Sequence, residues 1–147
     1  MTAFPRLPRY LCRVAVLLAV ATLPVSNPAA ASPRQSLLAD FAASAKAEDA
    51  TFDGFSAARG RALFLASPAS GKPETPSCTS CHTKNPRGVG ETRAGKRIEP
   101  MALSQSPDRY NDPKKVEKWF RRNCKSVLGR ICSAREKGDY LTFMISQ

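Results

Sequence analysis

Apolar residues recur at helical spacing just after the first thirty residues of the chain. Between positions 35 and 47 they fall at intervals of three and four, which predicts a short amphipathic helix with Leu37, Leu38, Phe41, Ala42 and Ala45 on its apolar face. A second helix is predicted over 56–65, where Gly60 would let another helix cross at close range.

Two further helices are predicted toward the C-terminus, each with a recognisable first turn. Asp112 and Pro113 supply an acidic N-cap and a proline in the first turn. Ser133 and Glu136 have the spacing of a capping box and precede a segment with an apolar face. The intervening stretch 83–111 is rich in Pro, Gly, Arg and Lys without a sustained period, which predicts a loop. Because no segment has a strand pattern, the fold is predicted to be all-α.

The first thirty or so residues have the features of an export signal. Three arginines precede an apolar stretch at 14–23, and a run of small residues ends at Ala31, where we expect cleavage. The apolar stretch is short for a membrane span, and Cys12 precedes it, so no stable membrane anchor is expected. We therefore predict a signal peptide at 1–31, a periplasmic location and an N-terminal helical extension at 32–54.

Charge and length limit what the mature chain can be. The full chain has 147 residues with 23 basic and 12 acidic side chains, and three of the basic ones lie in the predicted signal peptide. The remaining 116 residues carry a formal charge of +8, and they suffice for one domain with a modest core. Nucleic acid is not an expected partner outside the cytoplasm, despite this charge.

The pentapeptide Cys78-Thr79-Ser80-Cys81-His82 indicates the chemistry of the main domain at 55–147. Two thiols two residues apart, followed at once by a histidine, are the attachment signature of c-type haem. The thiols bond to the macrocycle and His82 becomes an axial ligand of the iron. The stretch 83–111 would then wrap the haem.

Two other readings of these thiols are less well supported. A zinc site could combine Cys78 and Cys81 with Cys124 and Cys132, but seven residues separate the second pair, against the two to four usual in structural zinc sites. A thioredoxin-like redox pair would need a βαβ context, which the flanking Pro-, Ser- and Gly-rich sequence does not offer.

The second axial ligand decides between electron transfer and ligand binding. His82 is the only histidine, so a second imidazole is excluded. Met144 lies among the apolar residues of the last helix and is most simply a core residue. Met101 follows Pro100 in the loop and could supply a thioether, although it could equally well contact the haem face as an apolar residue.

Asn123 is a third candidate for the axial position. At 100° per residue, with Val116 at zero, Trp119 falls at about 300°, Phe120 at about 40° and Asn123 at about 340°, so an amide is predicted within an apolar stripe. An unpaired amide in a core costs about 1 to 3 kcal/mol, and the iron could be its partner; a helix cap or a backbone bond is the ordinary alternative. The other side of this helix is predicted to be basic, between roughly 140° and 260° on the same projection, with Lys114, Lys115, Lys118, Arg121, Arg122 and Lys125.

Cys124 and Cys132 are the remaining thiols of the exported chain. A disulfide across the short loop 125–131 is the natural inference for an exported protein, and two buried free thiols are the alternative.

The motifs together resemble the sphaeroides haem protein family of oxygen-binding cytochromes c over nearly the whole mature chain. They comprise residues 60–65, 71–78, 107–110 and 116–119 with Arg122-Asn123-Cys124. The resemblance implies a small class I-like cytochrome c fold with one covalent, high-spin haem c and a Cys124–Cys132 bridge. It also implies that Asn123 ligates ferric iron and dissociates on reduction, so that oxygen or nitric oxide can bind. A di-haem cytochrome c is the implied electron donor.

The expected function is therefore that of a periplasmic mono-haem cytochrome that accepts electrons and binds a diatomic gas. Its expected iron ligands are His82 and Asn123, with Met101 and Trp119 as further haem contacts. The resemblance leaves open whether the protein also converts oxygen or nitric oxide. The main alternative is an ordinary low-spin electron carrier with His82 and Met101 as axial pair, and a haem-free protein held together by disulfides is another.

Overall fold

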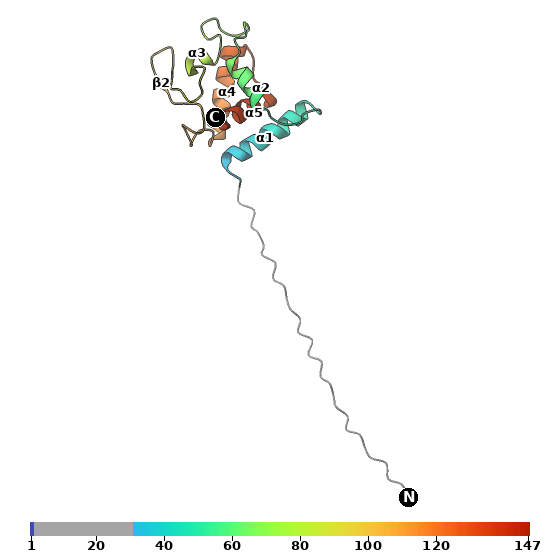
Figure 1. Cartoon of the computed structure of the whole chain (residues 1–147). Coiled ribbons are helices and arrows are strands. Elements are labelled where there is room, and N and C mark those ends of the chain that lie inside the picture. Colours follow the sequence, from blue (N-terminus) through green and yellow to red (C-terminus); the bar gives the residue numbers. More distant parts are fainter. Residues whose placement is uncertain (2–30) are drawn as a thin grey trace.

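The computed structural model describes Met1 and residues 31–147, so the predicted signal peptide lies almost wholly outside the described residues. Helices dominate the described part of the chain (Figure 1), and the fold is all-α, as predicted. In order, the elements are α1 (Pro33–Glu48), α2 (Ala57–Leu65), α3 (Thr79–His82), β1 (Gly90–Glu91), β2 (Arg97–Ile98), α4 (Pro113–Leu128) and α5 (Ala134–Ile145). No helix of residues 31–147 is long and apolar enough to cross a membrane.

The helix ends form where the sequence places capping side chains. Asp112 accepts a hydrogen bond from the Lys115 backbone N–H at 3.0 Å and so caps α4, while Pro113 occupies the first turn. Ser133 and Glu136 form the capping box at the start of α5. Both predictions are confirmed. Gly129 ends α4 with a left-handed backbone, at φ 70°.

The crossing of α2 and α5 organises the domain. Gly60 is buried at this crossing, and a Cβ atom there would collide with the backbone carbonyl of Asp139 on α5. The buried carboxylate of Asp139 accepts hydrogen bonds from the backbone N–H of Ser56 at 2.6 Å and from the Arg59 guanidinium at 2.7 and 3.0 Å. The close crossing predicted from Gly60 is thus present. The ion pair between Asp139 and Arg59 and the hydrogen bond from Ser56 to Asp139 stabilise it.

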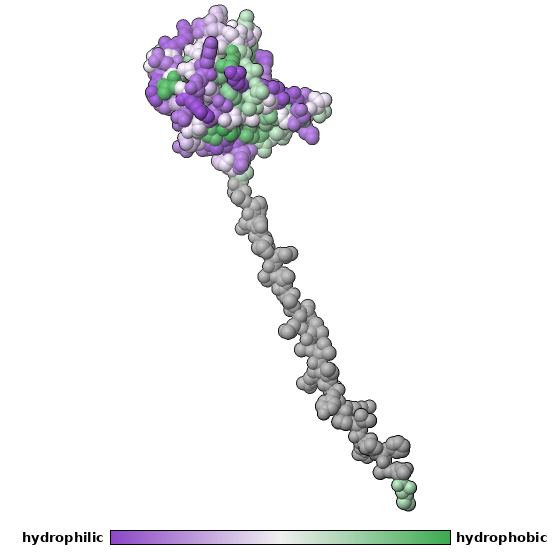
Figure 2. Space-filling model, in the orientation of Figure 1, coloured by the Kyte–Doolittle hydropathy of each residue, from purple (hydrophilic) through white to green (hydrophobic). Residues whose placement is uncertain are grey.

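The core consists of two apolar clusters that share α5. One joins α1, α4 and α5 through Leu37, Phe41, Val116 and Leu141. The other lies under α2 and contains Phe64, Met101, Phe143 and Met144. Met144 is fully buried there, in agreement with its reading as a core residue. Viewed from outside, hydrophilic residues cover most of the side on which β2 lies, whereas more apolar residues show toward α2 and α5 (Figure 2).

The segment 83–111 differs from the prediction, because it contains a small hairpin. β1 and β2 pair antiparallel, with Gly90 opposite Ile98 and Glu91 opposite Arg97. Strands of two residues are too short to produce a readable alternation, so the sequence pattern misses them. Gly90 packs against the carbonyl of Cys81, which brings the hairpin against the haem-attachment motif.

Candidate haem site

The attachment motif forms a single helical turn. Cys78 is the N-cap of α3, and its carbonyl accepts hydrogen bonds from the backbone N–H groups of Cys81 at 3.3 Å and His82 at 3.2 Å. Thr83 ends the turn with a positive φ of 57°. Both motif thiols are free of disulfides and half-buried. The turn therefore holds two thiols and one imidazole in a fixed order at one place in the fold.

Burial sets the protonation of these groups. It raises the pKa of the Cys78 thiol to about 11. It also lowers the pKa of His82, and the nearby Arg109 guanidinium lowers it further by repelling a second positive charge. The imidazole is thus neutral at pH 7, which is the form that ligates a metal. Its Nδ1 atom is buried without a hydrogen-bond partner among the described residues, so nothing in the protein competes for this ring. These properties fit an axial histidine.

A network of backbone hydrogen bonds holds the segment around Met101. The N–H groups of Met101 and Ala102 both donate to the Pro86 carbonyl, at 2.8 and 2.9 Å. The Tyr110 hydroxyl donates to the Met101 carbonyl at 2.7 Å, and Tyr110 itself has a left-handed backbone with φ 66°. Met101 is only 9% exposed and packs in the cluster around Phe64.

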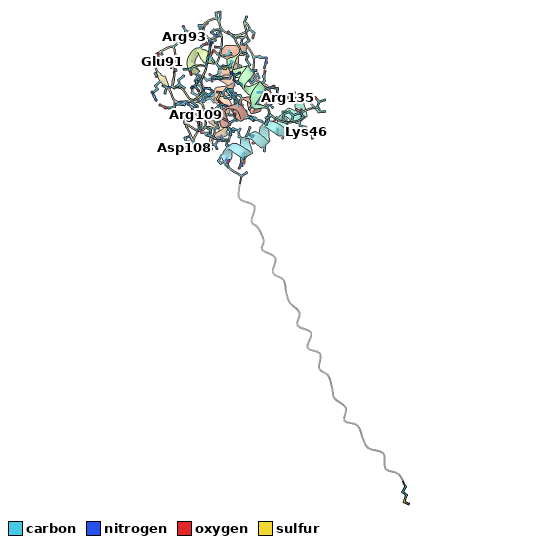
Figure 3. The ribbon with its side chains drawn as sticks, in the orientation of Figure 1. Lys46, Glu91, Arg93, Asp108, Arg109 and Arg135 are labelled. Atoms are coloured by element: carbon cyan, nitrogen blue, oxygen red, sulfur yellow. A yellow bond between two sulfur atoms is a disulfide. The ribbon has the colours of Figure 1, made fainter. Side chains whose placement is uncertain are left out.

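Two arginines extend this network to α1. The Arg109 guanidinium donates to the carbonyls of Pro100 and Glu99, both at 2.6 Å, and Arg34 on α1 donates to the carbonyls of Pro107 at 2.7 Å and Arg109 at 3.2 Å. Figure 3 shows Arg109 near the middle of the domain, away from the outer end marked by Arg93. Sequence reasoning missed the supporting roles of Arg34, Arg109 and Tyr110. Only the motif 107–110 pointed to this segment, and it did so through family resemblance.

Asn123 and Trp119 lie on the flank of α4 and not in its buried stripe. Cys124 and Val127 are buried together with Val116, whereas Asn123 is exposed and Trp119 is 45% exposed. Asn123 therefore lies between Trp119 and Val116 around the helix, at the edge of the buried stripe, with an exposed side chain. The projection was centred on Val116, but the buried residues centre some 35° further round, at about the position of Phe120, which leaves Asn123 and Trp119 at one edge.

Trp119 is nevertheless ordered by a neighbour on the same helix. The guanidinium carbon of Arg122 lies 5.0 Å from the centre of the indole ring, as in a cation–π contact. The side chain of Asn123, one turn after Trp119, has no hydrogen-bond partner in the described part of the chain. An indole and an unpaired amide thus share the edge of α4.

The predicted disulfide is confirmed. Cys124 and Cys132 are bonded, with Cα atoms 5.6 Å apart. The segment between them is not a simple loop, however, because α4 continues to Leu128, so Asn123 lies within the helix and not at its end. The bridge takes up two of the four thiols that a zinc site would need, and the described residues contain no other cluster of metal-binding side chains.

A family model described as "Domain of unknown function (DUF1924)" matches residues 50–144. The chain belongs to this family. The match begins after α1 and includes the attachment turn, the Met101 segment, α4 and the disulfide, which are the parts that make up the site.

Two proteins that are similar to this chain carry the names of cytochromes. The cytochrome c-type protein SHP of Cereibacter sphaeroides is 53% identical over 91 residues, which cover 62% of this chain and 70% of SHP. Cytochrome c'' of Methylophilus methylotrophus is 38% identical over 71 residues, covering 48% of this chain and 49% of that protein.

Solved structures agree with these relatives. The structure of oxidised SHP, described as an oxygen-binding cytochrome c, matches with a TM-score of 0.72 and 46% identity over 79% of this chain and 97% of SHP. Oxidised cytochrome c'' matches with a TM-score of 0.68 and 28% identity over 78% and 94% of the two chains. The DUF1924 protein is therefore a c-type cytochrome with a class I-like fold, and its cofactor is one haem c.

Proposed function

We propose that this protein is a periplasmic mono-haem cytochrome that accepts electrons from a redox partner and binds a diatomic gas when reduced. The observation that carries the proposal is the attachment turn itself. It holds Cys78 and Cys81 in order beside the half-buried, neutral imidazole of His82, whose buried Nδ1 atom has no hydrogen-bond partner among the described residues. Cys78 and Cys81 would hold the haem covalently, and His82 would supply the proximal ligand. The haem supplies the iron that binds oxygen or nitric oxide.

The environment of Met101 argues against a role as axial ligand. Its thioether is packed with Phe64, Phe143 and Met144. Its backbone is tied on both sides, to the Pro86 carbonyl and to the Tyr110 hydroxyl. Turning the side chain out of the cluster would leave a cavity in the core, at a cost on the order of 2 kcal/mol. Met101 is therefore best placed to contact the haem face as an apolar residue.

The side chain of Asn123, unlike that of Met101, is not packed in the core. Its amide is exposed on the edge of α4 and makes no hydrogen bond to the described residues, so it can serve as a ligand at no cost to the fold. An amide oxygen is a hard, weak donor, which suits ferric iron better than ferrous iron. We infer that Asn123 occupies the distal position in the oxidised protein and withdraws on reduction, which opens that position to a gas. Trp119 lies one turn away on the same edge and would line the position.

The similarity to SHP supports gas binding, because SHP is described as oxygen-binding and shares half of its residues with this chain over the matched region. A di-haem cytochrome c or a comparable protein, as the family resemblance of the sequence implies, is the proposed electron donor. The cleavable signal predicted at 1–31 supports a periplasmic location.

One observation favours an ordinary electron carrier instead. Met101 belongs to the same cluster as Cys78, which places a thioether close to the attachment turn. A carrier with His82 and Met101 as axial pair would be low-spin in both oxidation states and would not bind carbon monoxide.

Optical spectra of three variants of the holoprotein distinguish these functions. We expect Asn123→Ala to change the ferric spectrum and to leave the ferrous spectrum and carbon monoxide binding intact. Met101→Leu, which preserves the packing volume, should leave both spectra unchanged, and Asn111→Ala serves as a matched change at another exposed asparagine. If Met101→Leu altered the ferric spectrum and Asn123→Ala did not, the ligand assignment would be wrong.

A further inference from the structure

One face of α4 carries a dense group of positive charges, here called the basic face. It consists of Lys114, Lys115, Lys118, Arg121, Arg122 and Lys125, and all six side chains are exposed. None of them forms an ion pair with another described residue. The single acidic residue of the helix, Glu117, points elsewhere and is bound by the Lys137 ammonium at 2.8 and 2.9 Å.

This arrangement does not serve the stability of the helix. Neighbours at spacings of three and four along the face repel one another, and Lys118 has such a neighbour on both sides. Lys114 and Lys115 lie in the first turn, where the helix dipole disfavours positive charge, and the first turn has no acidic residue. The stability of the helix therefore does not account for the charges of the basic face.

We propose that the basic face of α4 docks the acidic surface of the protein that donates electrons to the haem. The proposal rests on the proposed function, since it requires an electron donor. Charge complementarity identifies the occupant, because six unpaired cations on one exposed surface attract a negatively charged partner and speed its encounter. The same helix carries Asn123, the proposed distal ligand, outside the basic face, at about 340° against roughly 140° to 260° for the cations.

A protein partner fits this face better than a lipid surface. Helices that bind in a membrane interface insert an apolar face between the lipids. The apolar residues of α4, Val116, Cys124 and Val127, are instead buried in the domain. No apolar side chain interrupts the six cations, and Trp119 lies at their edge beneath Arg122.

The hairpin offers a second basic surface, which the test has to exclude. Arg93 and Lys96 are exposed in the turn between β1 and β2, and Figure 3 shows Arg93 at the outer end of the domain. Lys46, on α1, lies on the opposite side of the domain in the same view. Three double charge reversals therefore change the net charge equally at three different places.

The experiment measures reduction of the ferric holoprotein by stopped flow. The donor is reduced flavodoxin, an acidic protein that passes one electron to the iron, and photoreduced lumiflavin serves as an uncharged small donor. The variants are Lys118→Glu with Arg121→Glu on the basic face, Arg93→Glu with Lys96→Glu on the hairpin, and Lys46→Glu on α1 with Arg61→Glu on α2. The haem spectrum and the thermal midpoint of each variant report whether it is folded.

We expect the basic-face pair to slow reduction by flavodoxin at least about tenfold at low ionic strength, and the difference to vanish in high salt. The other two pairs should slow it much less, and reduction by lumiflavin should be the same for all variants. Equal slowing by all three pairs would mean that only net charge matters, and a larger effect of the hairpin pair would place docking there. Either result would overturn the proposal.

Two further outcomes distinguish docking of an electron donor from membrane binding and from failure of the proposed function. If the basic-face pair abolished sedimentation with vesicles of phosphatidylethanolamine and phosphatidylglycerol but left the flavodoxin rate unchanged, the face would bind membranes and the proposal would be wrong. Failure of the wild-type protein to accept electrons even from lumiflavin would refute the proposed function itself. An unchanged ferric spectrum in Asn123→Ala would leave the docking result unaffected.

Discussion

Replacing Gly60 by alanine tests whether the α2–α5 crossing is as close as the structure has it. A Cβ atom added at this position would lie 2.5 Å from the carbonyl carbon of Asp139 and 2.9 Å from the Cβ atom of Phe143, and closer still to the Asp139 oxygen. None of these atoms is the end of a flexible side chain. The carbonyl belongs to the middle of α5, so the two helices would have to move apart.

Two effects of opposite sign decide the outcome. Alanine is favoured over glycine inside a helix by about 1 kcal/mol, so helix propensity alone predicts that Gly60→Ala stabilises the protein. Overpacking costs typically about 1 to 3 kcal/mol, and a backbone obstacle places this site at the upper end. We therefore expect a net loss of about 2 kcal/mol, or roughly 6 to 12 °C in the melting temperature of a domain this size.

Thermal and urea unfolding of the holoprotein, followed by far-ultraviolet circular dichroism, measure this loss. Ala58→Gly is a matched control, because Ala58 is an exposed residue of the same helix and reports propensity without the crossing. It should cost about 1 kcal/mol. A melting temperature of Gly60→Ala at or above that of the wild type would refute the crossing geometry.

Two other changes test contacts near α5. Replacing Cys124 and Cys132 together by serine should lower the free energy of unfolding by about 2.5 kcal/mol, since the bridge closes a segment with a sequence separation of 8, and urea titration with and without reductant checks this. The Arg130 guanidinium, by its hydrogen bonds, holds the pKa of Glu136 below its usual value, so the pair contributes stability above the unfolded pKa and loses it as the pH falls through the folded one. The Glu136→Gln variant should thus be less stable than the wild type near pH 7, by less than about 1 kcal/mol because Arg130 is largely exposed. The stabilities of the variant and the wild type should converge below about pH 4. A stability difference that does not change with pH would contradict the pairing of Glu136 with Arg130.

The parts of the fold that the sequence predicts well are those with local causes. The start of a helix depends on a side chain that lies three residues or fewer from the backbone group that it caps. The N-caps Asp112 and Ser133 could therefore be predicted from the sequence alone. The attachment motif is equally local, since its five residues form one turn. Gly60 could be linked to a close crossing because a glycine inside a helix has few other uses.

Features that depend on distant contacts were not predictable in this way. The direction in which α4 faces the core is set by what packs against it, and Phe120 meets Phe41 of α1 at 6.0 Å and Tyr140 of α5 at 5.5 Å between ring centres. These contacts place Phe120 near the centre of the buried side of α4. The hydrogen bond from the Arg34 guanidinium to the Arg109 carbonyl joins residues 75 positions apart in the sequence. No periodic pattern in the sequence indicates such a contact.

The contacts that fix α4 in the domain limit how Asn123 can move when the iron is reduced. The Cys124–Cys132 bridge ties the helix to the start of α5, and the loop before the attachment turn packs against its last turn, where the Lys72 N–H donates to the Ser126 carbonyl at 2.7 Å. Gly71 lies so close to the same backbone that a Cβ atom would collide with it. A helix held on both sides in this way cannot slide or tilt readily. If Asn123 leaves the iron on reduction, as proposed, the motion must therefore be a rotation of its own side chain, which needs only rotamer changes on an exposed edge.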